Sequence, residues 1–311
     1  MNSYRALSLA GLAVLWLGTA MAAPDARRQG VLILAHGGSA EWNASVERAV
    51  ADARLSYPTA IAFGMGMTPQ DVSHIEHAVT HLSAQGVTEI LAVPLLVSSH
   101  SEVYRQYEYL LGLRADSPWP NHTPQPLQLS VPVRLGTALD AHPYLAEIVV
   151  ERASALSRDA IKEVVILVAH GPTDEADNAA WLAQMRTIAK RLRAAGGFAD
   201  VEACTLRDDA PADVQAQATA TLRALVEQHS RSARVLIVPL LIARGGIEQK
   251  IPQRLAGLRF TYAAETLLPH PRVAQWIRET VEALRQVRGA TRRDFWYNWS
   301  GAPQASAQDS L

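Results

Sequence analysis

Short, unbroken apolar runs recur along the chain and predict its strands. Residues 31–35 and 164–169 contain only Val, Leu, Ile and Ala, and residues 90–97 and 235–242 are apolar apart from one proline in each. Strands that are covered on both faces of a parallel sheet have this continuous pattern. We therefore predict two buried parallel strands in each half of the chain.

Amphipathic segments lie between these runs, and residues 69–85 form the clearest. Thr68 can cap the helix, Pro69 suits its first turn, and Gly86 ends it. Its predicted buried stripe consists of Val72, Ile75, Val79 and Leu82. The alternation of strands and helices predicts an α/β fold made of two tandem, doubly wound parallel-sheet domains with a cleft between them.

The two halves are an internal duplication, because four anchors recur in the same order. A strand ends in His-Gly, and it is followed by Pro-x-Asp-Val, Val-Pro-Leu-Leu and His-Pro; these begin at His36, Pro69, Val93 and His142, and again at His170, Pro211, Val238 and His270. We predict an N-terminal domain over residues 24–158, which ends in a helix over residues 145–157, and a C-terminal domain over residues 159–288.

Both chain ends differ from the repeats. Residues 1–23 have a basic start at Arg5, an apolar stretch and a small-x-small site at Ala20-Met21-Ala22, which is the pattern of a cleavable signal peptide. We expect a periplasmic or secreted protein that does not stay inserted in a membrane once the signal is removed. Residues 289–311 are expected to form a flexible tail.

Composition and motifs argue against nucleic acid, disulfides and nucleotides. The formal net charge is −1, which gives no basic footprint for nucleic acid. The single cysteine, Cys204, cannot form an internal disulfide, so the exported protein must be stabilised by packing. No phosphate-binding glycine loop follows either first strand, so we expect no nucleotide. The sequence carries no signal for an oligomeric state.

The loop after the first strand carries a candidate functional histidine. In open α/β sheets, ligands bind outside the carboxyl ends of the strands, where His36 lies. The following Gly37 lets backbone approach a ligand closely. His170 is the twin of His36, so part of the pattern belongs to the scaffold. Asn43 begins the next helix, where its amide could orient the loop or a ligand.

The loop after the Val-Pro-Leu-Leu run carries the second candidate. His100 occurs only in the first copy, and Glu102 follows two residues later. A neutral imidazole can ligate a divalent metal or accept a proton, and a nearby carboxylate can hold its tautomer or carry protons away. A solvated helix start is the alternative interpretation of this segment.

The remaining histidines favour structural roles. His142 and His270 each precede a proline and introduce a helix, so we predict that they are caps. His74, His77 and His81 share one helical face, where they could gather a metal, although three solvated polar residues are the favoured interpretation.

With these motifs in place, the chain resembles the class II, ATP-independent chelatases. The nearest likeness is to the single-polypeptide sirohydrochlorin cobaltochelatase and ferrochelatase family, over residues 30–287. The resemblance implies two similar α/β domains and insertion of a divalent metal into a tetrapyrrole, in sirohaem or cobalamin biosynthesis. His36 and His100 match the family's metal-binding and catalytic histidines. Glu102 has no such match, and its proposed part in proton transfer comes from the residue pattern alone.

A tetrapyrrole substrate carries carboxylates, so basic residues are expected at the rim of the cleft. The candidates are Arg105, Arg244 and Lys250, with Asn43 as a further binding residue. Two imidazoles and a carboxylate suit Co²⁺, Fe²⁺ and Ni²⁺, so the metal is open.

Export leaves a second function open. Sirohydrochlorin is made in the cytoplasm, whereas residues 1–23 indicate export. A periplasmic protein on this fold could therefore bind or carry a metal or a tetrapyrrole without turnover. An unrelated hydrolase on the same fold would need a nucleophile, and the sequence offers no Gly-x-Ser-x-Gly elbow.

Overall fold

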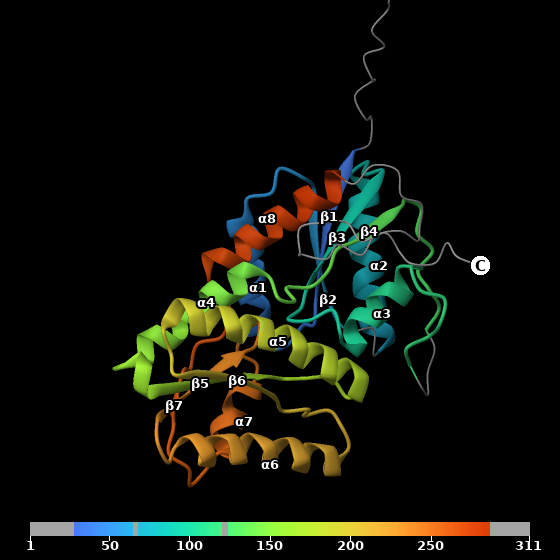
Figure 1. Cartoon of the computed structure of the whole chain (residues 1–311). Coiled ribbons are helices and arrows are strands. Elements are labelled where there is room, and N and C mark those ends of the chain that lie inside the picture. The colour runs from blue at the N-terminus through green and yellow to red at the C-terminus, as the bar shows by residue number, and fades with distance from the viewer. Residues whose placement is uncertain (1–27, 65–67, 120–123, 287–311) are drawn as a thin grey trace, which may run out of the picture.

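Each repeat forms its own four-stranded parallel sheet in the computed structural model, which describes residues 28–64, 68–119 and 124–286 (Figure 1). The predicted signal segment 1–23 and tail 289–311 lie outside these residues. The first sheet has the order β2-β1-β3-β4 and the second β6-β5-β7-β8. The strands are β1 (Gln29–Ala35), β2 (Thr59–Phe63), β3 (Glu89–Leu95), β4 (Val133–Leu135), β5 (Glu163–Ala169), β6 (Asp200–Thr205), β7 (Arg234–Leu240) and β8 (Thr261–Tyr262). The four predicted strands and the doubly wound fold class are confirmed.

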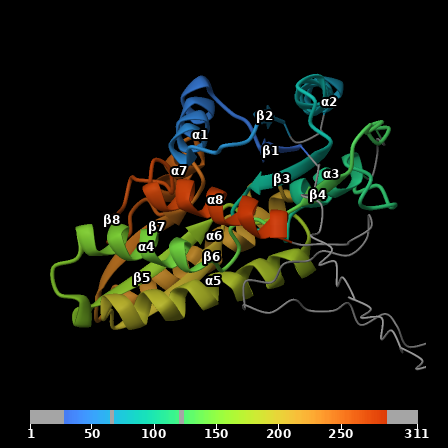
Figure 2. The same ribbon diagram turned by 90° about the horizontal axis from the view of Figure 1, so that it is seen from above.

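Helices connect the strands and cover both faces of each sheet (Figures 1 and 2). They are α1 (Ala40–Ala53), α2 (Pro69–Ala84), α3 (Glu102–Leu110), α4 (Pro143–Leu156), α5 (Glu175–Gly196), α6 (Ala212–His229), α7 (Ile247–Arg254) and α8 (Pro271–Gln286). The predicted start of α2 is confirmed: Thr68 and Asp71 form a reciprocal capping box, and Pro69 is the first helical residue. Gly86 follows with a φ of +77°.

The strand register brings three loops of each repeat to one edge. At the end of β1, Ala35 pairs with Phe63 and with Leu95. Ala169 at the end of β5 has the same relation to β6 and β7. The loops that follow these strands therefore leave from one edge of each sheet, as parallel pairing requires.

The last helix of each repeat packs on the sheet of the other repeat. Helix α4 lies against α5 and β7, whereas α8 lies against α1 and β3. Arg134 donates to the Leu284 carbonyl at 3.0 Å, and Arg234 donates to the Leu156 carbonyl at 2.9 Å, so both exchanged helices are also tied by their C-terminal carbonyls. The predicted limits 24–158 and 159–288 thus follow the sequence repeat, while in space the closing helices are exchanged.

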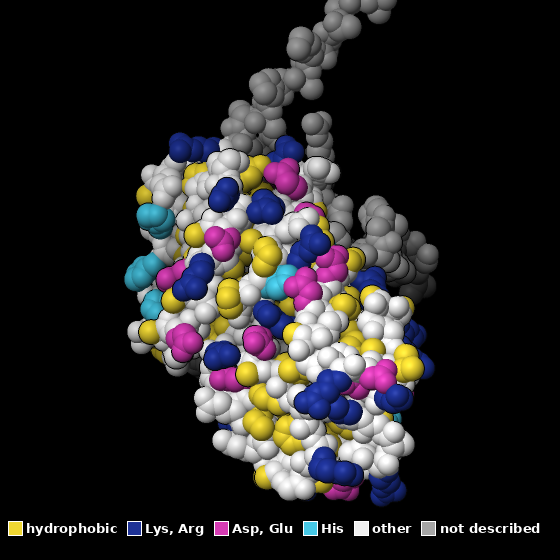
Figure 3. Space-filling model, turned by 90° about the vertical axis from the view of Figure 1, so that its left-hand side faces the viewer, with side chains coloured by type: hydrophobic (Ala, Val, Ile, Leu, Met, Phe, Trp, Pro, Cys, Tyr) yellow, Lys and Arg dark blue, Asp and Glu magenta, His cyan; other side chains and the backbone are white. Residues whose placement is uncertain are grey.

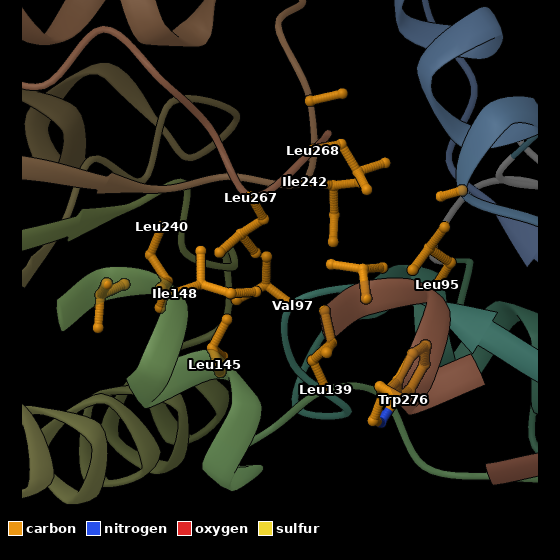
Figure 4. Close-up of a cluster of buried hydrophobic side chains, with 14 of the residues drawn as sticks. Leu95, Val97, Leu139, Leu145, Ile148, Leu240, Ile242, Leu267, Leu268 and Trp276 are labelled. Atoms are coloured by element: carbon orange, nitrogen blue, oxygen red, sulfur yellow. The ribbon is translucent and has the colours of Figure 1, made fainter. Parts of the chain in front are cut away.

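This exchange produces one central hydrophobic core that both repeats share. The core contains the inner faces of both sheets together with α1, α4, α5 and α8. Figure 4 shows part of it, with Ile148 of α4 near Leu240 and Leu267, and Trp276 of α8 near Leu139. Separate clusters on the outer faces hold α2 and α3 on the first sheet, and α6 and α7 on the second.

We expect Ile148→Ala to lower the free energy of unfolding by about 2–5 kcal/mol, because it leaves a cavity in the shared core. Ile148 is fully buried. The matched control is Ile161→Ala, since Ile161 is 73% exposed and should change stability by less than about 0.5 kcal/mol. Chemical denaturation measures both, and equal effects of the two substitutions would contradict the assignment of α4 to the core.

Candidate functional site

A cavity of about 280 Å³ lies where loops from the two repeats meet. Its walls come from the loops that follow β1, β3, β5, β6 and β7, together with α1, α3, α5 and α7. The predicted cleft between the domains is therefore present, and both repeats supply its walls. On the face shown in Figure 3, basic and acidic side chains are mixed over the molecule.

His36 lines this cavity, and its backbone fixes its tautomer. Gly37 has a φ of +81°, which places its carbonyl oxygen 2.6 Å from His36 Nδ1. A carbonyl can only accept, so Nδ1 must carry the proton in this contact. The neutral ring then has its lone pair on Nε2, which is the form that a metal ligand or a proton acceptor requires.

His170 lines the same cavity with the same backbone geometry. Gly171 has a φ of +76°, and its carbonyl oxygen lies 2.8 Å from His170 Nδ1. From the sequence, His170 was only the twin of His36 and had no assigned role, and the structure places it in the cleft with His36. The duplication of the His-Gly strand was the signal that could have identified it.

His100 lies beside the cavity and does not line it. Its neighbours Ser98, Ser101 and Glu102 are lining residues, while the His100 side chain is exposed. The backbone amide of His100 donates to Ser98 Oγ at 3.1 Å. The structure thus brings His36 and Glu102 to one cavity and leaves His100 on the same loop, next to that cavity. Metal binding by His100 stays a prediction.

Asp140 holds the loop that carries His100. Its carboxylate accepts hydrogen bonds from the Ser99 amide at 2.7 Å and the Ser99 hydroxyl at 2.9 Å. Gln184 of the second repeat donates to it at 2.9 Å. Burial raises the pKa of Asp140, and these hydrogen bonds and the nearby His100 oppose the rise. The loop position therefore depends on both repeats.

Glu102 binds the second repeat across the cleft. Its carboxylate accepts from the Thr173 amide at 2.7 Å, from the Thr173 hydroxyl and from the Asp174 amide at 3.1 Å. These groups form the N-terminus of α5, where a negative charge is favourable. Burial alone would raise the pKa of Glu102, but the hydrogen bonds outweigh it and lower the pKa. Its geometry is that of an interdomain clamp, and a part in proton transfer stays a prediction.

The predicted basic residues lie around the cleft in different settings. Arg105 forms an ion pair with Asp177, and Lys250 forms one with Asp208. The Arg244 side chain is exposed beside Gly245, and it lies over a separate hollow with Glu248 and Tyr262. None of the three basic residues is among the described residues that line the cavity.

Asn43 positions a loop. Its side-chain oxygen accepts the Gly38 amide at 2.9 Å, directly after the His36-Gly37 pair. This is the loop-orienting alternative of the two that the sequence left open, and binding of a ligand by Asn43 stays a prediction.

Two tryptophans that the sequence analysis did not single out form part of the cavity wall. Trp42 packs near the His36 ring, with ring centroids 6.2 Å apart. It also contacts the second repeat, because a Cβ added at Gly245 would lie 3.1 Å from Trp42 Cδ1. Trp181 supplies the matching wall from α5, and its buried indole N–H has no described hydrogen-bond partner. A flat apolar ring could lie between such surfaces.

The other histidines have the structural roles that the sequence favoured. His142 accepts the Tyr144 amide at 3.2 Å and caps α4. Burial lowers its pKa to about 4, against the opposing charge of Glu279. His270 accepts the Arg272 amide at 3.1 Å in the same way. Within the described ranges, no group of three or more His, Cys, Asp or Glu side chains is arranged to hold a metal, so the row His74, His77 and His81 is not such a cluster.

Cys204 is buried in the second repeat. Burial raises the pKa of the Cys204 thiol to about 11, so its thiolate is scarce at neutral pH and it is a poor nucleophile. Of the helices that the structure describes, none combines the length and apolarity that a membrane span needs.

We expect Glu102→Gln to destabilise the protein at neutral pH, because an amide replaces the charged acceptor of the interdomain clamp. A lowered pKa in the folded state stabilises the protein above the unfolded value of about 4.3 and loses this effect as the pH falls further. The difference from wild type in urea midpoint should therefore shrink in acid. Glu227→Gln on the exposed face of α6 is the control, and a pH-independent difference for Glu102→Gln would contradict the clamp.

Solved structures with the same fold include three chelatase-like proteins. SirB from Bacillus subtilis with Fe³⁺ is 20% identical with a TM-score of 0.56, and the match covers 83% of this chain and 96% of that one. CbiX, described as the terminal enzyme for biosynthesis of siroheme in denitrifying bacteria, is 16% identical with a TM-score of 0.52, covering 82% and 98%. DR2241 from Deinococcus radiodurans, a multi-domain protein with structural similarity to chelatases, is 20% identical with a TM-score of 0.52, covering 85% and 56%.

No curated protein sequence matches the chain. A family model does, and it matches twice, over residues 30–156 and again over residues 164–284. The two matches coincide with the two repeats and together span most of the chain, so the protein belongs to the CbiX family.

Proposed function

We propose that this protein is an ATP-independent chelatase that inserts a divalent metal into a sirohydrochlorin-type tetrapyrrole. The observation that carries the proposal is the interdomain cavity, in which His36 presents Nε2 beside the aromatic wall of Trp42 and Trp181. Membership of the CbiX family supports it, as do the siroheme enzyme and the Fe³⁺-bound protein among the similar structures.

Metal insertion makes three demands on a protein. The ion must be held while its waters leave, the macrocycle must be bound in a fixed position, and two pyrrole N–H protons must be removed. The tautomer of His36 suits the first demand, and His100 on the adjoining loop is the predicted second ligand. The apolar wall suits the second demand, because a tetrapyrrole ring is flat and apolar on its faces.

The charged rim can orient the tetrapyrrole carboxylates. Arg244 is the strongest of the three predicted cations, because its side chain is exposed and the next residue, Gly245, lines the cavity. Arg105 and Lys250 already neutralise Asp177 and Asp208, so each would have to exchange its partner for a substrate carboxylate. Asn43 would act through the loop that holds His36.

The proposal also specifies the metal and the pathway. Co²⁺ and Fe²⁺ are the proposed metal substrates, and Ni²⁺ fits the same ligands. The product would then enter cobalamin or sirohaem biosynthesis. No nucleotide is required by this chemistry, since metal insertion releases only protons.

A carrier without turnover is the second candidate. Two observations favour it: His100 does not line the cavity, and the Glu102 carboxylate is already engaged by Thr173 and Asp174. Such a protein would bind a metal or a tetrapyrrole in the same cleft and release it unchanged.

We expect the protein without residues 1–23 to metallate sirohydrochlorin when Co²⁺ or Fe²⁺ is added, with a change in the absorption spectrum at catalytic turnover. Both His36→Ala and His100→Ala should lower the rate, on the order of a hundredfold or more, because each removes a predicted metal ligand. His77→Ala is the matched control, since His77 lies on an exposed face of α2 and should leave the rate unchanged.

The outcomes separate the two candidates. Spectral binding of sirohydrochlorin without metallation in the wild type would support the carrier and overturn the chelatase. A full rate in His100→Ala would remove this residue from the metal site and leave His36 as the ligand.

We also propose that the protein is exported, from the signal pattern of residues 1–23. Expression of the whole chain in a Gram-negative host should yield a periplasmic protein that begins near Ala23 or Pro24. Mass spectrometry of the fractionated protein measures this. An intact N-terminus in the cytoplasmic fraction would contradict export.

A further inference from the structure

Two histidines face the cleft with matching backbone geometry, but their surroundings differ at Nε2. His170 Nε2 lies 3.4 Å from Asp209 Oδ2, whereas His36 Nε2 has no carboxylate partner among the described residues. The difference arises in the sequence. Alignment of the Pro-x-Asp-Val anchors places Met67 at the position that Asp209 occupies in the second repeat. The two repeats therefore offer the cleft two imidazoles with different chemistry.

The hydrogen bond to Gly171 makes His170 a directed base. Because Nδ1 donates to the Gly171 carbonyl, the lone pair of the neutral ring is on Nε2. A proton taken at Nε2 creates an imidazolium, and a carboxylate at 3.4 Å stabilises that cation. Asp209 is 73% exposed, so a proton can pass from this pair to bulk water.

Asp209 is the carboxylate of this loop that is open to His170. Its neighbour Asp208 is held by Lys250 and Arg254, which together lower the Asp208 pKa against the effect of burial. Arg207 is engaged by Glu175 and by the carbonyl oxygens of Pro172 and Thr173. Asp208 also interacts with His170 through its charge, but its own ion pairs hold it, and Asp209 is the carboxylate of this loop in direct contact with the imidazole.

We propose that His170 is the base that removes the pyrrole N–H protons and that Asp209 positions and stabilises it. This inference rests on the proposed chelatase function. It assigns metal binding to the first repeat and proton abstraction to the second, so that the two functions lie on opposite walls of one cleft.

The proposed step balances in atoms and charge. The Nε2 lone pair forms an N–H bond as the pyrrole N–H bond breaks, and the electron pair left on the pyrrole nitrogen binds the metal. The imidazolium returns its proton to water past Asp209, and the neutral ring then accepts the second proton. Two protons leave for each divalent ion inserted, so no oxidant, reductant or nucleotide is consumed.

The test follows Co²⁺ insertion into sirohydrochlorin in wild type, His170→Ala and His170→Asn. The asparagine amide can still donate to the Gly171 carbonyl, which protects the loop if alanine disturbs folding. We expect kcat to fall by a factor on the order of 10²–10⁴ while KM for both substrates stays close to wild type. Added imidazole should restore part of the rate in His170→Ala, which a structural role would not allow.

Asp209 needs a separate readout because it acts through His170. We expect Asp209→Asn to lower kcat less than His170→Ala does, and Asp209→Glu to restore most of the loss. His77→Ala again serves as the matched histidine control, and equilibrium binding of metal-free sirohydrochlorin checks that each variant keeps its cleft.

The failures are distinguishable. If the wild type does not metallate sirohydrochlorin, the proposed function is overturned. If the wild type is active and both His170 variants keep its kcat, the chelatase stands and the base is not His170. A higher KM for sirohydrochlorin with an unchanged kcat would make His170 a binding residue and would also overturn the inference.

Discussion

The hydrophobic core shared by the two repeats is the constraint on which the rest of the structure depends. Because α4 covers the second sheet and α8 the first, neither repeat can bury its inner face alone. Separation of the repeats would expose apolar surface that costs about 25 cal/mol for each Å². The carboxyl edges of the two sheets are therefore held near each other by the main stabilising force of the fold, and the cleft between them is formed before any ligand arrives.

Polar contacts set the positions of the loops that leave this shared core. Individually, exposed ion pairs such as Lys162–Asp159 contribute little. The clamp at Glu102 differs because three donors at the start of α5 converge on one carboxylate oxygen. Together with the link from Ser98 to Gln184 at 2.6 Å, it makes the loop after β3 part of the interface as well as part of the cavity wall. A change in this loop would thus alter substrate binding and domain packing at once.

Sequence reasoning succeeded where the cause of a structure is local. The apolar runs, the capping box at Thr68 and the caps at His142 and His270 depend on neighbours within a few residues, and all are confirmed. Sequence reasoning missed the features that depend on contacts between segments far apart in the chain. The exchange of α4 and α8 leaves no local trace, since the apolar face of a helix does not specify which of two sheets it will cover. The engagement of Glu102 with Thr173 likewise joins residues 71 positions apart.

Duplication explains why the cleft can be two-sided. A repeated strand-end His-Gly pair gave two imidazoles whose Nδ1 atoms are fixed by the same backbone contact, at 2.6 Å and 2.8 Å. The core conserves this geometry because the strands and the glycines at positive φ are common to both copies. At exposed positions of the surrounding loops the two copies differ, so that one carries His100 and the other Asp209. Separate chemistry on the two walls is therefore the expected outcome when a rigid duplicated frame carries loops that differ at their exposed positions.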